Sequence, residues 1–299
     1  MNDRPLVSCV IPTYRRSDTL SRAIDSVLKQ TYSNVEVLVV DDNEKDSPDS
    51  LNVSKLVQSY SDYRVKLITQ PKHINGAEAR NAGIRASKGD YIAFLDDDDV
   101  WLPTKIERQM EAMSDHPECS GSSCLYSHYG KDRVIRSCPP YSSDNLHRKI
   151  IGRDVAVFTS TVVLKKDKLL ESGLFNINLK RHQDLQLLLD FTRHNKIVVL
   201  NEYLVKLYVD SNINRANDVQ RLIEVKERFF EACNNHLDLY TKKERKDILA
   251  AHYFEIILAA LRGRNWAVTL KYIFKVGINF RAYFQLRKRM LGRRIKVEI

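Results

Sequence analysis

The sequence is poor in the features that mark disulfide-stabilised or zinc-binding proteins. It contains five cysteines, an odd number, and none of them belongs to a CxxC pair. No pair of histidines accompanies Cys119 and Cys124 at the spacing of a zinc finger. We therefore expect structural thiols at all five positions, which are Cys9, Cys119, Cys124, Cys138 and Cys233.

Long hydrophobic runs are also absent from the sequence. The apolar run at residues 6–11 is too short for the core of a signal peptide, and it has no basic flank. No later segment reaches the ~20 apolar residues that a membrane-spanning helix needs. The 299 residues, 43% hydrophobic and 29% charged, are typical of a globular protein that buries its core without disulfides. These features predict a cytoplasmic protein.

The net charge of +10 comes from one end of the chain. Residues 261–299 hold eleven lysines and arginines and a single acid, Glu298, so residues 1–260 contain 37 charges of each sign. A neutral body without a recognisable RNA- or DNA-binding motif argues against nucleic acid as a partner. Apolar residues recur at helical spacing within the basic segment, at Trp266, Leu270, Ile273, Phe274, Gly277 and Ile278.

This basic segment has the pattern of a helix that lies on a membrane surface. Basic amphipathic helices commonly bind anionic membranes, where each cation near the surface contributes about 1 kcal/mol. We expect residues 262–299 to hold the protein on the inner face of the plasma membrane as a peripheral protein. The alternative is a helix that packs on its own domain and exposes its lysines and arginines to solvent.

Strand and helix patterns alternate at the start of the chain. Short apolar strands are predicted at residues 7–11, 35–40, 65–69 and 91–95. Helices are predicted between them: the first is capped by Ser17 or Asp18, and the others cover residues 51–60 and 77–86. This order predicts an α/β fold with a mostly parallel central sheet covered by helices on both faces. In such sheets ligands bind beyond the carboxyl ends of the strands.

The pattern weakens in the second half of the chain. Residues 119–151 predict short strands and polar turns, and a strand at 159–164 precedes a helical turn closed by Gly173. A helix begins near residue 185, and a strand follows at 197–200. After residue 217 the sequence is helical and charged, which predicts a separate C-terminal helical segment.

Four consecutive aspartates, Asp96, Asp97, Asp98 and Asp99, follow the fourth predicted strand. Adjacent carboxylates repel one another, so their position at the end of a buried strand is costly unless a cation is present. Mg²⁺ and Mn²⁺ take oxygen ligands, commonly one or two carboxylates together with substrate phosphates. The run therefore indicates a metal–diphosphate site. The alternative is a solvated acidic loop before a helix, with Asp99 as the cap.

Further polar residues follow the other strands. Tyr14, in the run Pro12-Thr13-Tyr14, is positioned to lie against a planar base, and Asp42 to accept from a base N–H or a ribose hydroxyl. Arg80 begins a helix, where it is able to meet a phosphate. Taken singly, these residues have plain alternatives: packing for Tyr14, a turn for Asp42 and a surface ion pair for Arg80. Their occurrence on one rim of the sheet favours a ligand site.

With these residues the chain resembles the family-two glycosyltransferases with the GT-A fold. The resemblance covers about residues 6–210 and preserves the order and approximate spacing of the family's motifs. Its segments are Val7 to Tyr14, Val39 to Asn43, Ala79 to Gly83, Gly89 to Asp99, Thr159 to Thr161, Glu171 to Phe175 and Arg181 to Leu185. The resemblance implies an inverting transferase that moves a sugar from a nucleotide sugar, usually a UDP-hexose or UDP-N-acetylhexosamine, although dTDP or GDP remains open.

The resemblance also implies roles for individual residues. Asp98 and Asp96 fall on the Asp-x-Asp motif that binds Mn²⁺ or Mg²⁺, with Asp98 the more direct ligand. The nucleotide-binding residues that it implies are Pro12, Thr13, Tyr14, Arg16, Asp42, Arg80, Asp96 and Asp97.

Asp184 falls on the catalytic base of the family. Gln183 stands where the family usually has an acid, and this departure leaves the assignment of the base intact. His182 and Trp101 are candidates for contact with the acceptor or a phosphate, and a loop histidine without a special role is the alternative for His182. With one carboxylate base and no second carboxylate nucleophile, we expect a single displacement with inversion.

The resemblance suggests how the chain is divided. We expect a GT-A domain at residues 1–215, with a nucleotide-binding part at about 1–115 and an acceptor-binding part at about 116–215. The helical segment at 216–299 follows. A membrane-bound enzyme would suit a glycan acceptor linked to a polyprenyl diphosphate, as in the synthesis of bacterial surface polysaccharide, O-antigen or capsule.

Two other functions are weighed against this interpretation. The aspartate run formally fits the loop of a haloacid-dehalogenase-like phosphatase, but there the aspartates follow the first strand and here they follow the fourth. A catalytically silent sugar-nucleotide-binding module would have lost Asp184 or the metal-binding aspartates, and both are present. Sugar-nucleotide pyrophosphorylases share the fold class but carry a glycine-rich N-terminal loop that is missing here.

Overall fold

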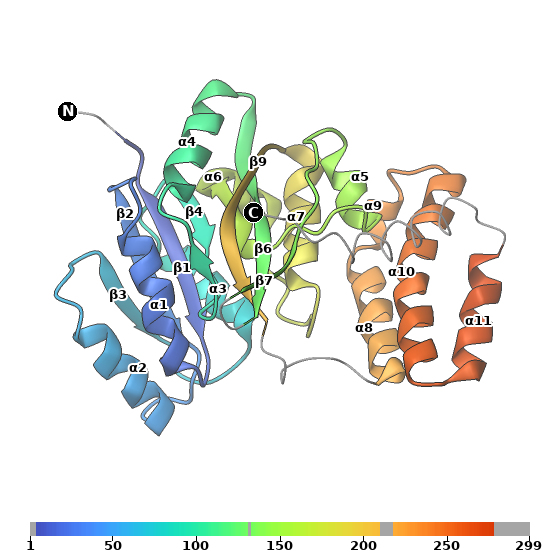
Figure 1. Cartoon of the computed structure of the whole chain (residues 1–299), viewed down its shortest axis with the longest axis horizontal. Coiled ribbons are helices and arrows are strands. Elements are labelled where there is room, and N and C mark those ends of the chain that lie inside the picture. The colour runs from blue at the N-terminus through green and yellow to red at the C-terminus, as the bar shows by residue number, and fades with distance from the viewer. Residues whose placement is uncertain (1–3, 131–132, 210–217, 278–299) are drawn as a thin grey trace.

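The computed structural model describes residues 4–130, 133–209 and 218–277. These residues form a central sheet flanked by helices, and a further group of helices stands beside it (Figure 1). The sheet has nine strands, and the candidate site residues lie near its middle.

One half of the sheet is entirely parallel. In spatial order it contains β3 (Val65–Thr69), β2 (Val35–Asp41), β1 (Val7–Thr13) and β4 (Tyr91–Phe94). All seven residues of β2 are buried, which matches the prediction of apolar strands covered on both faces. The predicted strands and helices of this half are confirmed within a few residues.

The other half of the sheet is mixed. It continues with β8 (Val162–Lys165), β6 (Cys119–Gly130), β9 (Lys196–Tyr208) and β5 (Val100–Trp101), and β7 (Arg133–Ser137) pairs with β6. In this half only β6 and β9 run parallel to each other. The prediction of short strands after residue 119 is wrong for β6, which has 12 residues. Its buried serines, Ser122 and Ser123, hide the apolar pattern that marks a strand.

Helices cover both faces of the sheet. On one face α1 (Ser17–Leu28), α2 (Pro48–Gln58) and α4 (Lys105–Asp115) share one hydrophobic core cluster with Val7, Cys9 and Ile11 of β1. On the other face lie α3 (Gly76–Ala86), α5 (Leu146–Ile151), α6 (Lys166–Ser172) and α7 (Gln183–His194). The predicted cap of α1 is wrong, because its N-cap is Arg16 and no side chain caps it. The predicted α/β architecture is otherwise confirmed.

The C-terminal helices form an apolar cluster of their own. It is built from α8 (Val219–Ala232), α10 (Lys242–Arg262) and α11 (Trp266–Val276), and the short α9 (Asn234–Leu237) joins α8 to α10. Within the described part of the chain, no helix is long and apolar enough to cross a membrane. Ile278 and the basic residues from Arg281 onward lie outside the described residues.

Candidate active site

The ends of β1 and β4 are joined by a hydrogen bond between side chains. Thr13, the last residue of β1, donates from its Oγ1 to Oδ2 of Asp97, which follows β4, over 2.7 Å. Pro12, half-buried, lies beside Val40 of β2 in the parallel register. The structure therefore brings the residues after β1 and those after β4 to one rim, as the sequence predicts.

Asp42 is buried just beyond β2 and accepts several hydrogen bonds. Its Oδ1 accepts from Nε2 of Gln70 over 3.0 Å and from the backbone N–H of Ile74 over 3.1 Å. Nδ1 of His73 lies 2.9 Å from its Oδ2. Burial raises the pKa of Asp42, and the N–H of Ile74 and His73 oppose that shift.

The ring of His73 stacks on that of Tyr14, with ring centroids 4.0 Å apart and 19° between the planes. Tyr14 and Asp42 are thus joined through a residue that sequence reasoning missed. His73 lies in a polar loop after β3, and no local pattern distinguishes it. Tyr14 and His73 thus form an aromatic stack next to the buried carboxylate of Asp42.

Two arginines pair with the aspartate run. The guanidinium of Arg80, in α3, pairs with Asp96, and that of Arg16, just before α1, pairs with Asp98. Nη1 of Arg16 also lies 3.7 Å from Asp97. The structure thus brings Arg80 and Arg16, both predicted to bind the nucleotide, together with the predicted metal-binding aspartates.

The buried aspartates of the run hold protons more readily than free aspartates do. Burial and the charge of Asp98 raise the pKa of Asp97 to about 7, against the hydrogen bond from Thr13. Burial and Asp96 likewise raise the pKa of Asp98, against the pull of Arg16. Repulsion in a buried site of this kind is relieved by a divalent cation.

The alternative of a solvated acidic loop is wrong. Asp97 is 6% exposed and Asp99 is 5% exposed. Asp99 does not cap a helix. It accepts from the hydroxyl of Ser160 over 2.9 Å and from the backbone N–H of Tyr208 over 3.2 Å. Asp99 therefore links the aspartate run by hydrogen bonds to Ser160 and to the end of β9.

Asp184 lies in the first turn of α7, and its Oδ1 accepts from the N–H of Leu185 over 2.8 Å. Burial raises its pKa, while that N–H, Arg153 and Arg80 lower it and the charge of Asp96 raises it further. The predicted base is therefore within electrostatic reach of Arg80 and Asp96, although it follows Asp97 by 87 residues in the sequence.

Trp101 does not lie where an acceptor would meet it. It is 2% exposed, and its indole N–H donates to the carbonyl of Ser160 over 2.8 Å. The ammonium of Lys105 lies 3.9 Å from the centre of its rings. We therefore remove Trp101 from the candidate site, because its size and its hydrogen bond serve the core.

His182 takes a left-handed conformation, with φ of 64°, at the N-cap of α7. Its ring meets Phe229 of α8 edge to face, with centroids 5.5 Å apart. Its Nε2 is buried and finds no hydrogen-bond partner among the described residues. Burial, with the nearby charges of Lys226 and Arg153, lowers its pKa to about 3, so the ring is neutral.

A polar network behind Asp184 was not found from the sequence. Nε of Arg153 donates to Glu255 of α10 over 2.9 Å, and Nζ of Lys226 of α8 donates to the same carboxylate over 2.5 Å. His252 continues the network: its Nδ1 lies 3.1 Å from Lys226, and its Nε2 lies 2.9 Å from the carbonyl of Ile151. The network links α8 and α10 to the arginine that lowers the pKa of Asp184.

Residues 8–167 match the sequence model of a family described as glycosyl transferase family 2. The chain belongs to this family. It is therefore a glycosyltransferase, as the sequence predicted, and not a phosphatase. The match includes Thr13 at the end of β1 and the four aspartates after β4, but it ends before Asp184.

Known proteins resemble this glycosyltransferase over different lengths. It is 43% identical over 111 residues to the UDP-Glc:alpha-D-GlcNAc-diphosphoundecaprenol beta-1,3-glucosyltransferase WfgD of Escherichia coli, a match that spans 37% of this chain and 42% of WfgD. It is 29% identical over 255 residues to the amylovoran biosynthesis glycosyltransferase AmsB of Erwinia amylovora, covering 80% of this chain and 82% of AmsB. The chain therefore spans less than half of the first relative and most of the second.

A solved structure supports the fold assignment. The mannosyltransferase PcManGT of Pyrobaculum calidifontis, solved in complex with GDP-Man and Mn²⁺, aligns with a TM-score of 0.63 at 18% identity. The alignment covers 97% of this chain and 81% of that chain. The predicted GT-A fold with C-terminal helices is confirmed.

Proposed function

We propose that this enzyme transfers a hexose from UDP to a hydroxyl of a glycan acceptor that is linked to a polyprenyl diphosphate, with inversion at the anomeric carbon. The main support is that Arg80, which pairs with Asp96, also lowers the pKa of Asp184, as expected of a base that lies near the proposed diphosphate site. WfgD is described as a transferase that uses UDP-Glc, which supports UDP-glucose as the first donor to test.

In this proposal, the nucleoside binds where β1 and β2 end. The buried carboxylate of Asp42 accepts from the base, and the ring of Tyr14, stacked on His73, supports the planar face of that base. Pro12 and Thr13 form the adjoining wall. Arg80 and Arg16 pair with the aspartates that would hold the metal ion, so they lie where the metal-bound diphosphate would sit. Their guanidinium groups match the geometry of phosphate oxygens.

Asp98 and Asp96 would hold the Mn²⁺ or Mg²⁺ ion. The described residues contain no group of three or more His, Cys, Asp or Glu side chains that would hold a metal alone. Two carboxylates fit an ion whose other ligands are substrate phosphates and water, which is the usual manner of Mg²⁺. When bound, such an ion neutralises charge on the nucleoside diphosphate as it leaves.

Asp184 performs the proton transfer. The acceptor hydroxyl attacks the anomeric carbon, its proton passes to the carboxylate of Asp184, and the bond from that carbon to the UDP oxygen breaks with its electron pair. A pKa raised by burial makes Asp184 a better proton acceptor than a solvated aspartate. A single base and a direct attack from the face opposite UDP give inversion.

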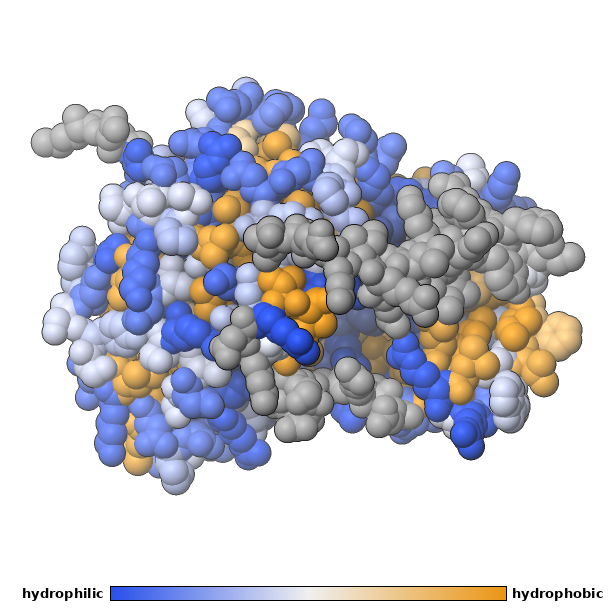
Figure 2. Space-filling view, viewed as in Figure 1, coloured by the Kyte–Doolittle hydropathy of each residue, from blue (hydrophilic) through white to orange (hydrophobic). Residues whose placement is uncertain are grey.

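The exposed side of α11 supports binding to an anionic membrane. Trp266 is 64% exposed and Phe274 is 82% exposed, while Tyr272 and Val276 pack inward on the C-terminal cluster. Figure 2 shows apolar side chains gathered over the end of the molecule where α11 lies in Figure 1. Co-sedimentation with anionic and neutral vesicles tests this point, with Trp266→Ser and Phe274→Ser expected to weaken binding to the anionic ones.

Transfer assays test the proposed reaction. The purified enzyme is incubated with a panel of nucleotide sugars and a hexose-diphosphate alkyl acceptor, with and without Mn²⁺, and the anomeric configuration of the product is read by NMR. We expect turnover of one UDP-sugar, dependent on metal, with inverted configuration. Nucleotide binding without any transfer would favour a silent binding module, and retention would contradict the single displacement.

A further inference from the structure

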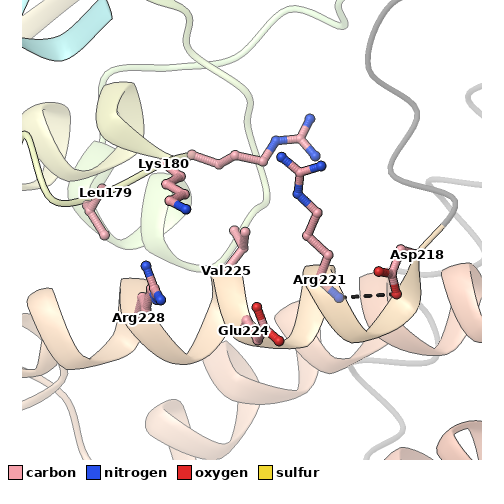
Figure 3. A pocket seen from close by; sticks show the side chains of 8 residues that line it. Leu179, Lys180, Asp218, Arg221, Glu224, Val225 and Arg228 are labelled. Atoms are coloured by element: carbon pink, nitrogen blue, oxygen red, sulfur yellow. Dashed lines mark hydrogen bonds between the residues drawn. The ribbon is translucent and has the colours of Figure 1, made fainter. Parts of the chain in front are cut away.

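A cavity of about 290 Å³ lies between α8 and the loop that precedes α7. Four cationic side chains line it: Lys180 and Arg181 from the loop, and Arg221 and Arg228 from α8. In Figure 3 the ammonium of Lys180 points from the loop toward α8, and the guanidinium groups of Arg221 and Arg228 rise toward the loop. The cations therefore converge on the space between the two elements.

The acids in the cavity do not neutralise these cations. Asp218 is engaged at the start of α8, where its Oδ1 accepts from the backbone N–H groups of Gln220 and Arg221 over 2.9 and 3.3 Å. Glu224 is the other acid of the lining. Within residues 4–130, 133–209 and 218–277, no ion pair joins the four cations to any acid. The cavity thus carries an excess of two positive charges.

The loop that lines the cavity leads directly to the proposed base. Lys180 and Arg181 stand four and three residues before Asp184, and Nε2 of Gln183 donates to the carbonyl of Leu179 over 2.5 Å. The contact between His182 and Phe229 ties the same loop to α8. Only His182 and Gln183 therefore separate the cationic lining of the loop from Asp184 along the chain.

We propose that this cavity binds the diphosphate group of the acceptor, while the sugar linked to that diphosphate presents its hydroxyl to Asp184. The proposal rests on the proposed function. A diphosphate carries several negative charges and many acceptor oxygens, which two arginines and further cations from opposite sides would grip by paired hydrogen bonds. The donor diphosphate is met by a different set, Arg16 and Arg80, so the two diphosphates have separate sites.

Calorimetric titration with a short alkyl diphosphate tests the site without requiring turnover. The enzyme is first saturated with UDP and Mn²⁺, so that the donor site is closed to the probe. We expect the wild type to bind alkyl diphosphate, and the double variant Arg221→Gln/Arg228→Gln to bind it at least about tenfold more weakly. Arg136→Gln, which removes an exposed arginine of β7, serves as the control and should bind the probe normally.

Transfer kinetics separate this site from general damage. The double variant should show a raised KM for a hexose-diphosphate alkyl acceptor and an unchanged KM for the UDP-sugar. Turnover of an alkyl glycoside that lacks the diphosphate should be unchanged as well. Equal losses on both acceptors, or no loss of probe binding, would overturn the proposal.

Two further outcomes are distinguishable. If the double variant loses affinity for anionic vesicles but keeps its affinity for alkyl diphosphate, the cavity binds lipid headgroups and the proposal is wrong. If the wild type fails to bind UDP, the proposed function fails, whereas the difference in alkyl diphosphate affinity between the wild type and the double variant still reports on the cavity.

Discussion

The guanidinium of Arg80 forms an ion pair with the carboxylate of Asp96, joining the first turns of α3 to the end of β4. Nη1 of Arg80 also donates to the carbonyl of Gly76 over 3.1 Å, and its guanidinium carbon lies 5.6 Å from the centre of the Phe175 ring. These contacts hold the planar guanidinium at the rim where we propose that the donor diphosphate binds. A lysine would keep the charge and lose the paired hydrogen bonds.

We therefore expect Arg80→Lys to raise the KM for the nucleotide sugar by about tenfold, equivalent to about 1.4 kcal/mol of binding. Initial-rate kinetics and titration with UDP measure the effect. Arg85→Lys is the matched control, because Arg85 lies on the same helix and pairs with Glu78 instead of the aspartate run. Equal effects of the two substitutions would contradict a donor-binding role for Arg80.

Asp42 gives a second test of the donor site. Asp42→Asn replaces a carboxylate oxygen by an amide NH₂ group, which cannot accept a hydrogen bond from an N–H of the nucleobase. UDP should therefore bind about tenfold more weakly. Titration with UDP, checked by the melting temperature of each variant, measures this change. Asp49→Asn, an exposed acid in the first turn of α2, is the control. Unaltered UDP affinity in the folded Asp42 variant would remove this residue from the site.

The pH profile should respond to Arg153. Asp184 must be deprotonated to act as a base, so kcat falls as the pH falls through the pKa of Asp184. Because burial raises this pKa, the acid limb of the pH profile lies above the ordinary range of an aspartate. The charge of Arg153 lowers this pKa, so Arg153→Gln should move the acid limb to higher pH. Profiles of kcat against pH measure the shift, with Arg136→Gln as the control. A limb that does not move, in a variant that remains folded, would contradict the coupling.

Gly83 tests the packing of α3 on the sheet. A Cβ at this position would lie 2.3 Å from Cγ1 of Val10. Val10 is fully buried, so its side chain cannot move aside without disturbing the core. Gly83→Ala should therefore lower the free energy of unfolding by about 1–3 kcal/mol, measured by denaturant titration. At Gly263 the nearest atom is 3.5 Å away, so Gly263→Ala should be nearly neutral. Similar stabilities for both variants would contradict this account of the packing.

The sequence predicted the parallel half of the sheet because its strands are continuously apolar and its functional residues follow those strands directly. Thr13, Asp42 and the aspartate run occupy the positions where parallel strands end, and the structure gathers them at one rim. Local order is enough for this result, since the ends of parallel strands meet at one edge.

Contacts between distant segments were beyond the reach of the sequence. His73 stands in a polar loop, and nothing nearby reveals that it stacks on Tyr14. Arg153 and Glu255 meet across 102 residues, and the apolar neighbours of Glu255 indicate only a buried helix face. Trp101 follows the aspartate run so closely that proximity in sequence suggested a site residue, whereas its size fills the core.

Asp184 is the proposed catalytic base, and the proposed mechanism depends on it. The most direct measurement compares wild type and Asp184→Asn for transfer with the preferred UDP-sugar, alongside UDP affinity. We predict a loss of about 10³-fold in kcat with UDP affinity unchanged, because the amide keeps the shape of the side chain and cannot take the proton. A variant that binds UDP and transfers sugar at near wild-type rate would contradict the assignment.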